Sequence, residues 1–189
     1  LAGVEPEPRS EVELTDFDPE GEIKVVAAAL YPASDLPDDQ LLALARRMTV
    51  EERKAVLAAY AGRRGNRRHK PGRAFERTAY RFDILADYGA FRDLQRHRLL
   101  TIEWQPLSPR HGYVIPDAVE EAGALSEWRR VMEESAALYD ALRSEGLETV
   151  APYAVAMAYR VRFYMEINAR EAMHVIELRT SPHGHPAYR

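Results

Sequence analysis

The sequence predicts an α+β fold, in one domain that follows an acidic segment. Strand-like and helix-like stretches mix along the chain without the regular βαβ repetition of a parallel sheet, and we find no internal repeat. With 189 residues, of which 46% are hydrophobic and 30% charged, the chain is long enough to bury a core. Residues 1–22 hold eight acidic residues against Arg9 alone, so we expect an acidic tail or linker there and a domain over residues 23–189.

The first half of this domain is expected to hold two helices between two strands. The apolar, valine-containing run at 23–30 predicts a short buried strand. Apolar residues at helical spacing predict a helix over 38–48, and the capping-box pattern Thr49-Val-Glu-Glu52 begins a second helix that ends at Gly62. Alternation of apolar and polar residues then predicts a half-buried strand near 76–86.

The second half is expected to add helices around one clear strand. We expect a short helix at 90–98, a brief extended piece at 112–116 and a long amphipathic helix over 117–145. Strict alternation over 160–167 predicts a strand. The sequence Asn168-Ala-Arg-Glu171 is typical of a helix N-terminus with a glutamate at its third position, and this last helix runs to about Arg179.

Composition excludes several classes of protein. The chain has no cysteine, so a thiolate nucleophile, a disulfide framework and a cysteine metal site are ruled out, as is usual for a reducing cytosol. A net charge of −4 does not favour nucleic-acid binding, and no apolar run reaches the 18–20 residues of a membrane span. We find no signal peptide and expect a cytoplasmic protein. Because the chain begins with Leu1 rather than Met, we expect a piece of a longer protein.

Three clusters of polar side chains stand out as candidate sites. The triplet Arg96-His97-Arg98, followed by Ser108 and Arg110, gathers arginine forks and a hydroxyl that suit a phosphate. The basic loop 62–73 is a second anion-seeking segment, and Arg170, His174 and Glu177 share one face of the last helix. The alternatives are a solvated basic turn and a solvated helix face. We expect no metal site, because His174, His183 and His185 lack a helical His-x-x-x-His spacing.

Taken together, these segments resemble the flavin-dependent thymidylate synthases, the ThyX family. That family carries an Arg-His-Arg signature, preceded by a histidine, a Phe-Glu pair and an aromatic-rich strand, and followed by a Tyr-Ile-Pro-like element and an Asn-x-Arg helix that ends in Leu-Arg. The matching segments, which keep the family's order over most of residues 20–189, are Arg96-His97-Arg98, His69, Phe75-Glu76, Tyr80-Arg-Phe82, Tyr113-Val-Ile-Pro116 and Asn168 to Arg179.

The resemblance implies a fold, a reaction and an assembly. The fold would have a central antiparallel sheet with a helical subdomain. The reaction would methylate dUMP to dTMP with methylenetetrahydrofolate as carbon donor, while FAD relays reducing equivalents from NADPH. Family members are homotetramers with active sites between subunits, so we expect a homo-oligomer or pairing with a second ThyX-like domain, in a tandem protein for example.

The resemblance also implies roles for particular side chains. Arg179 would polarise the uracil ring and act as the catalytic residue, because a fixed cation beside a carbonyl oxygen stabilises charge that develops during attack on the ring. Arg92, Ser108 and Arg110 would join Arg179 in binding the nucleotide. Contacts to FAD would come from the remaining family positions, which are His69, Arg96, His97, Arg98 and His174.

Two departures from the family pattern leave alternatives open. Pro106 stands where strict spacing puts the signature serine, and Asp93 stands where a glutamine normally helps to hold the nucleotide phosphate. An aspartate carboxylate repels a phosphate rather than donating to it. The first alternative is therefore a degenerate ThyX-like domain that keeps the fold and some flavin or nucleotide binding without catalysis. The second alternative is an unrelated α+β domain that binds an anionic partner.

Overall fold

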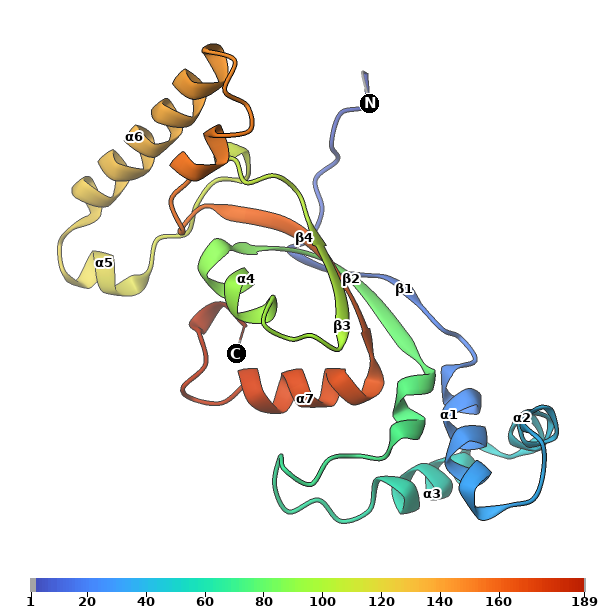
Figure 1. Cartoon of the computed structure of the whole chain (residues 1–189). Helices are drawn as coiled ribbons and strands as arrows, with labels where there is room; N and C mark the ends of the chain where they lie inside the picture. The colour runs from blue at the N-terminus through green and yellow to red at the C-terminus, as the bar shows by residue number, and fades with distance from the viewer. Residues whose placement is uncertain (1–2, 189) are drawn as a thin grey trace. The chain divides into compact units, whose positions relative to one another are not determined.

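A four-stranded antiparallel sheet is the centre of the fold, as the α+β prediction requires. The computed structural model describes residues 3–188. Along the sheet the strands follow the order β1-β2-β4-β3, so β2 and β4 are the inner strands (Figure 1). The strands are β1 (Val12–Phe17), β2 (Ala79–Asp87), β3 (Leu100–Trp104) and β4 (Arg160–Asn168).

The helices fall before, between and after these strands. Several of them lie where the sequence predicts a helix. Helix α3 begins with the expected capping box, in which Thr49 and Glu52 exchange hydrogen bonds. No helix in residues 3–188 combines the length and the apolar character that crossing a membrane requires. The helices are α1 (Gly21–Leu30), α2 (Asp38–Arg47), α3 (Val50–Ala61), α4 (Tyr88–Leu94), α5 (Asp117–Glu121), α6 (Leu125–Ser144) and α7 (Ala169–Arg179).

The strand expected at 23–30 is wrong, because this run is the helix α1. One side of α1 buries Val25 and Ala29, and another side packs Val26 and Ala27 against α2. A helix that is covered on two sides carries an uninterrupted apolar run, and periodicity alone does not separate such a run from a buried strand.

The acidic N-terminal segment contains an element that the sequence did not predict. Val12–Phe17, inside the expected tail or linker at 1–22, forms β1 at one edge of the sheet. Its side chains are mostly exposed, so the strand is held by its backbone rather than by burial. The division into an acidic segment over 1–22 and a domain over 23–189 stays a prediction, but residues 12–17 are part of the sheet.

The long helix expected at 117–145 is two helices, α5 and α6. Gly123 lies between them with a φ of +67°, in the left-handed region that ends helices at a glycine. A short helix is found at 88–94 rather than 90–98, and Asp87 caps it by accepting from the backbone N–H of Ala90. Strand β3, which begins two residues after Arg98, was not expected.

The chain divides into two compact units, and each has its own core. One unit comprises residues 1–13, 83–96 and 102–164, and its core includes Phe91, whose ring lies 4.9 Å from that of Phe163. The other unit comprises residues 14–82, 97–101 and 165–189, and includes the group of α1, α2 and α3 (Figure 1). The second unit also holds α7, which follows β4 directly.

Candidate active site

His97, the middle residue of the predicted triplet, is buried between two exposed arginines. Its side chain is 4% exposed, and its Nδ1 lies 3.0 Å from Oε1 of Glu171, which is buried as well. On the other side of the ring, Nε of Arg179 donates to Nε2 across 3.0 Å. All three residues belong to the second unit. Glu171 lies in the first turn of α7 and Arg179 in its last turn, so both ends of this helix contact one imidazole.

These two contacts define the protonation of His97. The carboxylate of Glu171 can only accept a hydrogen bond, and the guanidinium of Arg179 can only donate one. Nδ1 must therefore carry the proton and Nε2 must offer its lone pair, which is a neutral imidazole. Burial lowers the pKa of His97, with Arg179 and His174 lowering it further and Glu171 opposing the shift. The geometry and the pKa therefore agree on a neutral ring.

Arg179 is held on two sides at the end of α7. Besides its bond to His97, its guanidinium carbon lies 5.6 Å from the centre of the Tyr188 ring, in a cation–π contact. Gly184 allows the C-terminal segment to turn this closely, because a Cβ there would lie 2.2 Å from the carbonyl oxygen of Arg179. The predicted catalytic arginine is thus held by two side chains of the second unit, His97 and Tyr188.

His174 is exposed and lies edge-on to His97, with the ring centres 5.6 Å apart. His97, Glu171 and His174 form a group in residues 3–188 whose potential metal-ligating atoms lie within 4.8 Å of one another. A cation at this group would need a ring nitrogen of His97, and both nitrogens already have protein partners, one of them a guanidinium. The arrangement therefore does not favour a metal ion, and we propose none.

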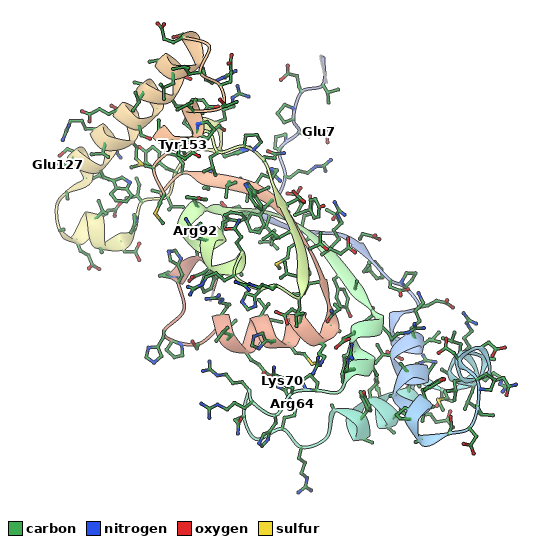
Figure 2. The ribbon with its side chains drawn as sticks, viewed as in Figure 1. Glu7, Arg64, Lys70, Arg92, Glu127 and Tyr153 are labelled. Carbon is green, nitrogen blue, oxygen red and sulfur yellow. The ribbon has the colours of Figure 1, made fainter. Side chains whose placement is uncertain are left out.

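The basic loop 62–73 is tied to α7 through Arg64. The guanidinium of Arg64 forms an ion pair of 2.6 Å with Glu177 and also donates to the carbonyl oxygen of His69. Figure 2 labels Arg64 and Lys70 in this loop. The Nδ1 of His69 accepts from the backbone N–H of Gly65 at 3.2 Å, while the side chain of His69 stays exposed. The stripe expected on α7 is therefore no free polar face, because Glu177 holds Arg64 and Arg170 binds Glu76 at 2.8 Å.

The remaining predicted residues divide between exposed and buried positions. Arg98 is exposed in the second unit. In the first unit, Arg96 is exposed and pairs with Asp93 at 3.3 Å, and the guanidinium of Arg92 lies over the ring of Tyr88. Ser108 is buried and Arg110 is exposed. The structure brings His97, His174 and Arg179 together, and the roles predicted for the other residues stay predictions.

Sequence reasoning missed Glu171, the partner of His97. A glutamate at the third position of a helix that begins with Asn168 is typical of a capping box. Here the cap is one-sided: Asn168 accepts from the backbone N–H of Glu171 at 2.9 Å, but the carboxylate of Glu171 turns to His97. A signal was present, because Glu171 and Val175 share the buried face of α7, where a carboxylate requires a partner.

Comparison with known families assigns the chain to one of them. The sequence model of the thymidylate synthase complementing protein family matches residues 13–189. The protein therefore belongs to this family, and the resemblance to ThyX is confirmed. The alternative of an unrelated α+β domain is wrong.

Three UPF0159 proteins are similar in sequence to this chain. A UPF0159 protein of Chlamydia muridarum is 40% identical over 99% of this chain, which corresponds to 36% of that protein. UPF0159 proteins of Chlamydia pneumoniae and Thermoplasma acidophilum are 40% and 36% identical, over 94% and 86% of this chain and 33% and 32% of their own lengths. The chain thus spans about a third of the length of the curated relatives it matches.

The fold also matches a solved structure. The crystal structure of a UMP/dUMP methylase from Streptomyces cacaoi, bound with 5-Br dUMP, aligns with a TM-score of 0.67 at 21% identity. The alignment covers 89% of this chain and 77% of that one. This agreement confirms the predicted ThyX-like fold with its central antiparallel sheet.

Proposed function

We propose that this protein methylates dUMP to dTMP as a flavin-dependent thymidylate synthase. The carbon of methylenetetrahydrofolate would be bonded to C5 of the uracil ring, whose hydrogen leaves as a proton. A hydride that originates from NADPH would reduce the methylene to a methyl group, so that tetrahydrofolate and NADP⁺ are released. Membership of the family and the fold of a UMP/dUMP methylase support this reaction class.

The observation that carries the proposal is the fixed guanidinium of Arg179. His97 holds its Nε at 3.0 Å and the Tyr188 ring stacks on it. A cation that is already held in place loses little freedom when negative charge develops on a uracil carbonyl oxygen, and so it stabilises that charge effectively. In this role Arg179 is the catalytic residue and binds the base.

The residues of the second unit suit a flavin cofactor in part. Three residues predicted to contact FAD are exposed, namely His69, Arg98 and His174. Their side chains can donate hydrogen bonds to the oxygens of a diphosphate or to a flavin ring. His97 has no ring nitrogen without a protein partner, so we assign the cofactor contacts of this unit to these exposed residues. When bound, FAD supplies the relay of reducing equivalents between NADPH and the substrate.

The nucleotide phosphate is assigned to residues of the first unit. Arg92 and Arg110 offer exposed guanidinium groups, and Ser108 offers a hydroxyl. Asp93, which departs from the family pattern, pairs with Arg96 at 3.3 Å. This ion pair offsets the negative charge that would otherwise repel a phosphate. We also propose a cytoplasmic homo-oligomer, or a partnership with a second ThyX-like domain.

The second candidate function is a non-catalytic domain that still binds flavin or nucleotide. The observation in its favour is Pro106, which is exposed and takes the place of the signature serine. A proline has neither a hydroxyl nor a backbone N–H to offer a phosphate.

Two measurements distinguish these functions. The purified protein is expected to be yellow, with a flavin spectrum that changes when dUMP is added, and to release tritium from dUMP labelled at C5 in the presence of NADPH and methylenetetrahydrofolate. Arg179→Ala should abolish tritium release, while the matched variant Arg130→Ala, on the exposed surface of α6, should not change it. A yellow protein without tritium release would favour the non-catalytic domain, and a colourless protein that dUMP leaves unchanged would contradict both.

A further inference from the structure

The contact between Glu171 and His97 is not explained by the Asn-x-Arg helix motif of the family. Glu171 lies in the first turn of α7, is 6% exposed and has its carboxylate 3.0 Å from Nδ1 of His97. An ionised carboxylate loses hydration when it is buried, and the loss is tolerated only where hydrogen bonds replace it. The contact to His97 is one such bond, so the orientations of the two side chains depend on each other.

This contact determines what His97 offers to Arg179. With Glu171 accepting from Nδ1–H, the imidazole is held with its Nε2 lone pair toward the Nε–H of Arg179. A ring with the opposite tautomer would present an N–H to an N–H, and a protonated ring would present a second cation. Only the neutral Nδ1–H form attracts the guanidinium.

We propose that Glu171 and His97 are positioning residues, which together hold the guanidinium of Arg179 in its working orientation. Glu171 acts through His97, and neither residue contacts the substrate. The catalytic meaning of this chain of contacts rests on the function proposed for Arg179, whereas the positioning itself does not. In this proposal His97 has a role other than the flavin contact that the family signature implies.

The same geometry makes the position of Arg179 sensitive to acid. The charged and titratable groups that face His97 are Glu171, His174 and Arg179, and the ring of Tyr188 lies against Arg179. When His97 takes up a proton at Nε2, the Nε–H of Arg179 loses this acceptor and the guanidinium faces a positive charge. The carboxylate of Glu171 raises the pKa of His97 against the larger lowering by burial, so removal of that charge makes the ring harder to protonate.

The first test needs no substrate and uses the whole chain in solution NMR. In the wild type and in Glu171→Gln, whose amide oxygen still accepts from Nδ1–H, we expect a single Nδ1–H tautomer of His97 and slow exchange of the Arg179 Nε–H with water. Glu171→Ala should speed that exchange, whereas the matched variant Glu166→Gln, at an exposed ion pair with Arg81, should not. An Nε2–H tautomer in the wild type, or unchanged Arg179 exchange in Glu171→Ala, would overturn the proposal.

The second test separates positioning from simple stabilisation. Glu171→Ala should lower kcat for tritium release by about tenfold to a hundredfold, the cost of one charge-assisted hydrogen bond, with little change in KM for dUMP. Glu171→Gln should keep more activity than Glu171→Ala. It should also shift the acid limb of the pH profile of kcat to lower pH than in the wild type, because His97 stays neutral to a lower pH. An acid limb that does not move would contradict the proposal. If the wild type releases no tritium, the proposed function fails, and the Arg179 exchange alone decides the positioning.

Discussion

At the scale of single residues, the triplet Arg96-His97-Arg98 is not one basic surface. The two arginines are exposed while the histidine is buried, so the middle side chain serves the interior and the outer two face solvent. A neutral buried imidazole between two surface cations costs less than a third cation would, because burial penalises the charged form. The triplet therefore combines an internal support for Arg179 with external charges that are available to an anion.

The anchoring of the basic loop by Arg64 leads to a prediction about Glu177. Glu177→Gln removes the charge from an ion pair of 2.6 Å, so Arg64 should hold the loop less firmly and backbone N–H exchange at Gly65 and His69 should become faster. Exchange can be followed residue by residue by NMR. Glu134→Gln, in an exposed ion pair on α6, is the control that should leave the loop unchanged.

The same ion pair has a defined pH dependence. Arg64 lowers the pKa of Glu177 below the ordinary value of 4.5, so the contact favours the folded loop above pH 4.5 and is lost as the pH falls through the lower, folded value. Protection of the loop should therefore persist at pH 5 and decline only in stronger acid. Equal protection in wild type and Glu177→Gln would show that Arg64 does not anchor the loop.

The polar clusters of the sequence include His97 and His174, and the family resemblance led to Arg179; the structure brings these three together. Sequence reasoning did not lead to Glu171 or Tyr188, since both contacts depend on tertiary neighbours rather than on local pattern. A glutamate three residues after a capping asparagine has an adequate local explanation. Only its position on the buried face of α7 indicates that the carboxylate needs a hydrogen-bond partner from elsewhere in the fold.

At the scale of elements, the sequence predicted best where one face alone is buried. Strand β4 and helix α7 have clean periodicity and a sharp boundary at Asn168, and both are confirmed. The helix α1 was mistaken for a strand because two of its faces are covered, and β1 was missed because almost none of it is buried. Periodic patterns record one-sided burial, so they are weakest at both extremes.

The boundary between β4 and α7 leads to a prediction about Asn168. Its side chain accepts from the backbone N–H of Glu171 at 2.9 Å, so Asn168→Ala should destabilise the protein by about 1 kcal/mol, the usual cost of a lost helix cap. Urea unfolding measures this loss. Asn168→Ser keeps a capping oxygen and should recover most of the stability, and an equal loss in both variants would mean that the cap is not the cause.

At the scale of the whole molecule, the fold class could be predicted but the strand order could not. The absence of βαβ repetition indicates an antiparallel sheet, yet nothing in the sequence pairs β2 with β4, which are separated by more than seventy residues of chain. The resemblance to ThyX supplied what periodicity could not, and both the family and the fold are confirmed. An assembly with shared active sites is implied by the resemblance alone.

Shared active sites would make two inactive variants complement each other. If nucleotide-binding Arg110 and catalytic Arg179 serve one site from different subunits, Arg110→Ala and Arg179→Ala should each be inactive for tritium release. A mixture whose subunits have been exchanged should then regain activity, because some sites receive neither substitution. The double variant, mixed with itself under the same conditions, contains no intact site and is the control. Inactivity of the mixture, despite mass-spectrometric evidence that subunits have exchanged, would indicate that each site is built from one subunit.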